Sequence, residues 1–146
     1  MKGDIRFAVR GLPIPQGNLR ASVVNGHAYL HEKSKGPLSA WRHAVASAAQ
    51  PYAPKTLWEG PVSITLLFTL PQPKSRKEWA GRGKNKRRVK WWPDRRPDVD
   101  KLARACLDAL TNVVFRDDAQ VVGLSATKRY GAPGVVVYLR RIGEED

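Results

Sequence analysis

One stretch of the chain, residues 99–113, limits the fold more than any other. It carries apolar side chains at helical spacing on one face, at Val99, Leu102, Ala103, Cys106, Ala109, Leu110 and Val113. That spacing predicts an amphipathic helix. The apolar stripe of such a helix must be covered by another layer, and we expect that layer to be a sheet.

Four other segments predict the strands of that sheet. Residues 5–10 and 62–70 alternate apolar and polar side chains, which indicates strands with one buried face. Residues 119–128 and 134–141 predict two further strands, joined by a Gly- and Pro-containing turn at 131–134. These strands give the helix an apolar face to cover.

Two more segments complete the expected order of elements. Residues 21–24 and 27–30 flank an Asn-Gly pair, which is a strong signal for a β-hairpin. Residues 37–50 repeat apolar side chains at helical spacing and predict a second helix. We therefore expect an α+β fold, with a small mixed or antiparallel sheet covered by two main helices, in a single domain of residues 1–146.

The segment at about residues 72–96 has a different composition. It contains eleven Lys and Arg together with several Pro and Gly, which predicts a long basic loop that is flexible without its partner. The whole chain has a formal net charge of +13 at pH 7. This charge indicates a polyanionic partner, and nucleic acid is favoured over an anionic membrane surface. The expected DNA contacts are Lys74, Arg76, Lys77, Arg82, Lys84, Lys86, Arg87, Arg88, Lys90, Arg95 and Arg96.

Three tryptophans, Trp79, Trp91 and Trp92, are interleaved with these cations. Aromatic rings in a basic loop can stack on exposed bases. A neighbouring Trp pair also commonly packs at the root of a loop, and we expect that for one of Trp91 and Trp92. The single cysteine, Cys106, excludes an internal disulfide framework and fits a reducing, cytoplasmic setting.

The acidic residues are concentrated in one part of the chain. Such a cluster does not increase the affinity of a basic protein for DNA. Six of the thirteen Asp and Glu lie between Asp94 and Asp118. Clustered carboxylates repel one another and repel phosphate, whereas a divalent cation inverts the local charge. Asp98 and Asp100, the entry acids, lie two residues apart just before the predicted helix. Their oxygens suit Mg²⁺, with Mn²⁺ as a substitute.

A second pair, Asp117 and Asp118, follows the helix, and we call these the exit acids. A helix of about four turns separates its ends by about 20 Å. The two pairs meet in one subunit only if the chain after Leu110 folds back, and otherwise another element completes the site. A third interpretation has no metal: Asp98 is only a helix cap, the exit acids only form a turn, and Asp100 pairs with Arg104 on the surface.

At these residues the sequence resembles the RusA family of Holliday junction resolvases, many of them encoded by phages or prophages. The resemblance is strongest over residues 95–130, and the preceding Arg96-Pro97 and the trailing Lys128 also fit. The family's Asp-x-Asp, Asp-Ala-Leu and Asp-Asp-x-Gln-Val motifs stand here as Asp98-Val99-Asp100, Asp108-Ala109-Leu110 and Asp117-Asp118-Ala119-Gln120-Val121. The resemblance implies a homodimeric, Mg²⁺-dependent endonuclease that cuts four-way DNA junctions by paired symmetric nicks.

The same resemblance assigns roles to individual residues. The implied metal ligands are Asp98, Asp100, Asp118 and Asp117, and the expected catalytic residues are Asp98, Asp100, Asp118, Arg104 and Lys128. The two cations would stabilise phosphate charge while a metal-activated water attacks. Arg104 stands where the family has Lys; Arg keeps the charge but cannot transfer a proton as Lys can.

Two functional hypotheses follow. The first is a junction-resolving endodeoxyribonuclease in the cytoplasm of a bacterial or phage-infected cell, associated with the nucleoid. The second is a non-catalytic basic protein that binds branched DNA, with the acids serving as caps and ion-pair partners.

Overall fold

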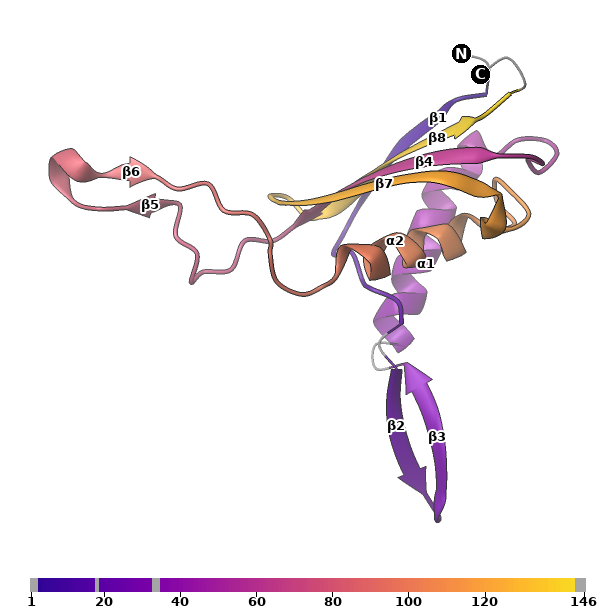
Figure 1. The fold of residues 1–146 in the computed structure, drawn as a ribbon, viewed down its shortest axis with the longest axis horizontal. Helices are drawn as coiled ribbons and strands as arrows, with labels where there is room; N and C mark the ends of the chain where they lie inside the picture. Colours follow the sequence, from indigo (N-terminus) through magenta and orange to yellow (C-terminus); the bar gives the residue numbers. More distant parts are fainter. Residues whose placement is uncertain (1–2, 18, 33–34, 144–146) are drawn as a thin grey trace.

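A four-stranded mixed sheet with two helices on one face forms the body of the molecule (Figure 1). The computed structural model describes residues 3–17, 19–32 and 35–143. The sheet order is β1-β8-β4-β7, in which β4 and β7 are parallel and the other neighbours are antiparallel. The strands are β1 (Ile5–Arg10), β4 (Val62–Leu70), β7 (Val121–Tyr130) and β8 (Gly134–Arg141). The predicted α+β fold is confirmed.

The core lies between this sheet and the helices α1 (Lys35–Ala49) and α2 (Val99–Leu110). In β4 every second side chain is buried, as the alternation predicts. The buried residues of α2 are five of the predicted apolar stripe together with Ala105: Leu102, Ala103, Ala105, Cys106, Ala109 and Leu110; Val99 of the stripe is half-buried. The other face of the sheet is not covered by either helix (Figure 1).

Helix α2 ends three residues before its predicted boundary. Thr111 is the C-cap, and its hydroxyl donates a hydrogen bond to the backbone oxygen of Leu107 at 2.9 Å. The next residue, Asn112, has φ 68°, a left-handed conformation that Asn tolerates better than most residues. Val114 and Phe115 then turn into the core. The apolar pattern continues past the helix because these following residues are buried too.

The expected hairpin is present and projects away from the sheet (Figure 1). It consists of β2 (Leu19–Val24) and β3 (His27–Glu32). Asn25 and Gly26 have φ values of 52° and 79°, as a tight two-residue turn requires.

Residues 72–96, which we call the basic arm, differ from the loop that the sequence predicts. The chain doubles back as a hairpin with β5 (Trp79–Ala80), a short 3₁₀ turn at Gly83–Asn85, and β6 (Arg87–Arg88). Gly81 and Gly83 adopt positive φ at the tip, and the amide of Val89 donates to the oxygen of Glu78 at 2.7 Å. The arm extends well beyond the end of the sheet (Figure 1). In the described part of the chain, no helix is long and apolar enough to cross a membrane.

Candidate active site and nucleic-acid interface

The entry acids lie in the open at the start of α2. Asp98 occupies the N-cap position, but its carboxylate accepts no capping hydrogen bond. That carboxylate instead lies 3.5 Å from the ammonium of Lys101, and the Asp98 side chain is 51% exposed. Asp100 is exposed in the first turn of the helix. Two accessible carboxylates at a helix start fit Mg²⁺, which usually takes one or two protein carboxylates and keeps several waters.

Lys128 fixes the chain that leads to these acids. Its ammonium donates to the backbone oxygens of Arg95 at 2.9 Å and Pro97 at 2.8 Å. The end of β7 is therefore tied to the segment immediately before Asp98. In this arrangement Lys128 positions the entry acids, in addition to any contact it makes with phosphate.

Three charged residues line one face of α2 at intervals of four: Asp100, Arg104 and Asp108. Residues at this spacing are neighbours on a helix surface. Arg104 is exposed, and its guanidinium lies beside Gly17, where a β-carbon would be only 3.4 Å away. Arg104 therefore lies midway along the helix, between the two regions that carry the acids.

Asp108 is held by residues that the sequence did not single out. Its carboxylate accepts a hydrogen bond from the Gln16 side chain and lies 4.0 Å from the Arg42 guanidinium. The Arg42 guanidinium also donates to the side-chain oxygen of Gln16 at 3.3 Å. The backbone amide of Gln16 donates to the backbone oxygen of Lys101 at 3.0 Å. The spacing of Asp100, Arg104 and Asp108 indicates the position of Asp108, but no local pattern marks Gln16 or Arg42, which are distant in sequence.

The exit acids form a tight turn before β7. Asp117 caps the 3₁₀ turn Asp118–Gln120, and its carboxylate accepts from the amide of Ala119 at 2.9 Å. The Gln120 side chain accepts from the Asp117 amide at 3.0 Å and donates to the Trp58 oxygen at 2.9 Å. Asp117 and Gln120 thus build the turn. Both acids are exposed, but only the Asp117 carboxylate caps the turn.

The electrostatic surroundings of Asp118 disfavour its negative charge. A hydrogen bond with the Asp117 side chain raises the pKa of Asp118, and partial burial and repulsion by Asp117 and Asp108 act in the same direction. Arg104 opposes the increase. A bound cation would relieve this repulsion, because it interacts favourably with every one of these carboxylates.

The entry and exit acids do not meet within one chain. Helix α2 has 12 residues, which separates its two ends by about 18 Å. Strand β7 then returns along the helix to the entry side (Figure 1). Among residues 3–17, 19–32 and 35–143, no three His, Cys, Asp or Glu lie close enough to hold one metal ion. The structure brings Asp98 near Asp100, and Asp118 near Asp117 and Asp108, as two separate groups.

The basic arm lies next to the entry acids and presents most of its cations to solvent. Ten of the eleven predicted DNA contacts are exposed. The side chain of Trp92 is 58% exposed, with the Lys90 ammonium 4.5 Å from its ring centre, and the ammonium of Lys86 lies 5.2 Å from the ring of Trp79. These cation–aromatic pairs combine positive charge with flat apolar surface, as single-stranded or unpaired bases require.

Arg76 is the exception among these cations, and here the structure corrects the prediction of a DNA contact. Its side chain is only 7% exposed and donates to the Trp92 oxygen at 2.7 Å and to the Asp94 carboxylate at 2.6 Å. The guanidinium also lies 5.1 Å from the ring centre of Trp91 and 5.9 Å from that of Tyr130. Arg76 therefore anchors the root of the arm. Trp91 contacts Arg76 there but is 37% exposed, so it is not the buried tryptophan that the sequence predicts.

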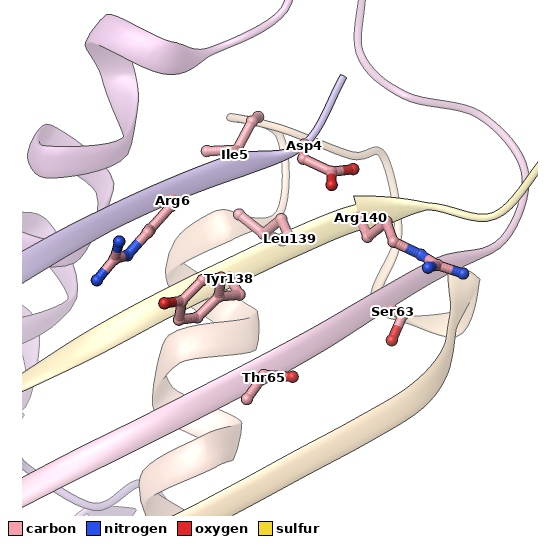
Figure 2. A pocket seen from close by; sticks show the side chains of 8 residues that line it. All are labelled: Asp4, Ile5, Arg6, Ser63, Thr65, Tyr138, Leu139 and Arg140. Atoms are coloured by element: carbon pink, nitrogen blue, oxygen red, sulfur yellow. The ribbon is translucent and has the colours of Figure 1, made fainter. Parts of the chain in front are cut away.

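A hollow of about 710 Å³ lies on the uncovered face of the sheet (Figure 2). Arg6, Thr65 and Tyr138 line its middle, with the Arg6 guanidinium 5.1 Å from the Tyr138 ring. None of the predicted site residues lines this hollow. The candidate chemistry therefore lies on the helix side of the sheet and at its two ends, not in this hollow.

Comparison with known proteins identifies the family of this chain. The model of the family described as "Endodeoxyribonuclease RusA" matches residues 10–140. The chain is also 34% identical over 145 residues to the uncharacterized protein YqaN of Bacillus subtilis (strain 168), a match that covers 94% of this chain and 96% of that protein. RusA-family proteins are nucleases that resolve Holliday junctions, act on branched DNA and generally depend on a divalent metal. The family match spans the arm, the entry acids and the exit acids, and the chain therefore belongs to the RusA family of endodeoxyribonucleases.

Proposed function

We propose that the protein is a Mg²⁺-dependent endonuclease that resolves four-way DNA junctions by paired symmetric nicks. The observation that carries the proposal is the state of Asp98 and Asp100. Both carboxylates are exposed at the start of α2, and Asp98 makes no capping bond, in a chain whose family cuts DNA. Exposed acids beside a strongly basic arm are better explained by metal-assisted hydrolysis than by helix capping.

Each residue has a defined task in this proposal. Asp98 and Asp100 would bind the ion from the helix start; Asp118, which lies apart from them within one chain, would complete its ligands, with Asp117 as a further candidate and Mn²⁺ as a substitute ion. A Mg²⁺ ion held by these residues would supply an activated water for attack and stabilisation of the leaving oxygen. The guanidinium of Arg104 stabilises negative charge that develops on the phosphate.

The exposed cations of the arm bind the phosphates of the junction arms. Counterion release makes such binding steeply dependent on salt. A two-fold homodimer matches the near two-fold symmetry of a four-way junction and provides two sites for paired cuts. The setting that we propose is the cytoplasm of a bacterial or phage-infected cell, at the nucleoid, in recombination, repair or the processing of branched phage DNA.

The test is cleavage of a synthetic four-way junction labelled on each strand in turn. The expected result is symmetric nicks near the branch point with Mg²⁺ or Mn²⁺, no nicks with chelator, and no cutting of a linear duplex. Asp100→Asn should bind the junction without cutting it, whereas Asp4→Asn, on the other face of the sheet, should cut normally. Tight binding without cuts in either metal would instead support a non-catalytic protein that binds branched DNA.

A further inference from the structure

We infer that a pocket at the root of the basic arm holds an unpaired nucleotide of the branched DNA, with the base stacked on Trp92 and the phosphate bound by Lys90 and Arg129. The inference rests on the proposed function for its DNA partner, and it names the part of that DNA which the arm recognises. It concerns binding, so it can be tested without metal and without cutting.

The pocket, which we call the root pocket, lies between the arm and the last residues of β7. Its volume is about 700 Å³, within the range of about 300–1,000 Å³ that is typical of pockets for small ligands. Its lining combines flat rings with positive charge: Trp91, Trp92, Tyr130, Arg88, Lys90 and Arg129. A nucleotide has the complementary chemistry, because it joins a flat base to an anionic phosphate.

The charges around the root pocket favour an anion. Glu78 is the one acid among the described residues that line it, and its carboxylate is paired with the Arg88 guanidinium at 2.9 Å. Lys90 and Arg129 are both exposed. These two cations are therefore left to neutralise a phosphate that enters with the base.

Contacts within the protein fix two of the aromatic walls. The indole nitrogen of Trp91 donates to the backbone oxygen of Lys77 at 2.9 Å. The Arg76 guanidinium lies 5.1 Å from the ring centre of Trp91 and 5.9 Å from that of Tyr130. The pocket is thus formed without a ligand, which reduces the entropy lost when a ligand binds.

Trp92 supplies the exposed stacking surface. Its side chain is 58% exposed, although its backbone oxygen is held by Arg76 at 2.7 Å. A large apolar ring left in water gains little from folding, and exposed apolar surface of this kind marks binding sites. The Lys90 ammonium lies 4.5 Å from the ring centre and covers one face of the ring. The second face of the ring can then stack on a base.

A base enters such a pocket only after it has left its pair. Inside a duplex both faces of a base are covered by neighbouring base pairs, so an aromatic side chain has no flat surface to contact. Extrusion costs least for a base that is mismatched or already unpaired. RusA-family proteins act on branched DNA, where the stack of base pairs is interrupted at the branch point. The branch point is therefore the source of the nucleotide.

Substitution of Trp92 tests the stacking contact. Loss of one base–aromatic stack should weaken binding by about tenfold, so we expect Trp92→Ala to raise the junction Kd by this factor in gel-shift titrations without metal. The slope of log affinity against log salt should stay the same, because no phosphate contact is removed. Trp92→Phe keeps a ring and should retain most of the affinity.

Two comparisons make this result specific. A linear duplex should bind Trp92→Ala as tightly as it binds the native protein. Tyr138→Ala removes another exposed aromatic ring, on the uncovered face of the sheet, and should leave both affinities unchanged. An unchanged junction Kd for Trp92→Ala, or an equal loss of affinity for the linear duplex, would overturn the inference.

Photochemical cross-linking locates the base directly. One thymine beside the branch point is replaced by 5-iodouracil, in each strand in turn, and the complex with the full chain is irradiated in the presence of chelator. The expected product joins this base to Trp92 or Tyr130, as identified by mass spectrometry, whereas 5-iodouracil within a paired arm should not form it. Cross-links confined to Trp79, near the tip of the arm, or no cross-links at all, would overturn the inference.

The same experiment separates this inference from the proposed function. If the native protein cuts no junction but Trp92 cross-links to the branch point, the proposed function fails and the root pocket stands. If the protein cuts junctions normally and no base cross-links to the pocket, the proposed function stands and the root pocket fails.

Discussion

The ammonium of Lys128 lies 2.8 Å from the backbone oxygen of Pro97. This bond connects the segment just before α2 to the end of β7. A single side chain thus connects the strand that follows the exit acids to the segment that carries the entry acids. The bond joins two backbone segments that are 31 residues apart in sequence.

Loss of this connection should affect cutting more than binding. Lys128→Met removes both hydrogen bonds while keeping a long side chain, so the entry acids lose their fixed position. Misplacement of catalytic groups by about 1 Å can cost on the order of 10²-fold in rate. We expect kcat to fall by about ten- to a hundredfold with the junction Kd little changed, as measured by single-turnover cleavage and gel-shift titration. A weaker Kd with unchanged kcat would show that Lys128 acts mainly as a phosphate contact.

The exit acids should control the acid limb of the pH profile. Asp117 raises the pKa of Asp118 by a hydrogen bond and by repulsion. The metal requires ionised Asp118, so activity is lost as pH falls through this raised pKa. Asp117→Asn removes a negative charge and should lower the pKa of Asp118, which shifts the acid limb to lower pH. Cleavage rates measured across pH at saturating Mg²⁺ would give the shift. If the acid limb of Asp117→Asn stays at the same pH, a group other than Asp118 controls it.

The same shift has a consequence for stability. A carboxyl whose pKa is raised by folding destabilises the folded state at pH values above its unfolded pKa, and that effect disappears below it. Asp118→Asn should therefore raise Tm slightly at neutral pH and leave it unchanged at pH 3. Thermal melts at the two pH values test this, with Asp4→Asn as the control. A lower Tm at neutral pH would show that Asp118 makes a stabilising contact.

The arm should contribute binding energy mainly through its charge. Arg82→Gln and Lys84→Gln remove two exposed cations, and removing one phosphate contact should lower the slope of log affinity against log salt by about one. The double variant is thus expected to bind the junction with a slope smaller by about two and to cut normally once saturated. Lys55→Gln, exposed outside the arm, should leave the slope unchanged. An unaltered slope in the double variant would exclude phosphate contact at these positions.

Arg104 should act through its charge. Arg104→Met is expected to lower kcat by about 10²-fold, the loss typical of one transition-state contact. Arg104→Lys keeps the charge and should retain most activity. If the lysine variant cuts far faster than the native protein, this position has a role in proton transfer that arginine cannot perform.

Local periodicity predicted most of the body of the fold. The alternation in residues 62–70 and the apolar stripe after Val99 require a strand and a helix in almost any globular context, and both are present. The Asn-Gly turn is equally local, because both residues tolerate positive φ. Each of these signals is complete within a few neighbouring residues.

Features that depend on distant contacts could not be predicted in this way. Arg76 is one cation among eleven in its segment, and only its position between Trp91 and Tyr130 distinguishes it from the others. The bond from Gln16 to Asp108 joins residues 92 positions apart. The hairpin of the arm carries no alternating apolar pattern, since both of its faces are exposed to solvent. For the exit acids, the sequence allowed both a single-chain and a shared site, because their position relative to the entry acids depends on where the chain turns after α2.

The anchoring of Arg76 against Tyr130 also connects the arm to the acids at the start of α2. Tyr130 is the last residue of β7, so the root of the arm is attached to the end of that strand. Lys128 of the same strand holds the segment before Asp98. A phosphate contact made by the arm would therefore also fix the position of the DNA relative to Asp98 and Asp100.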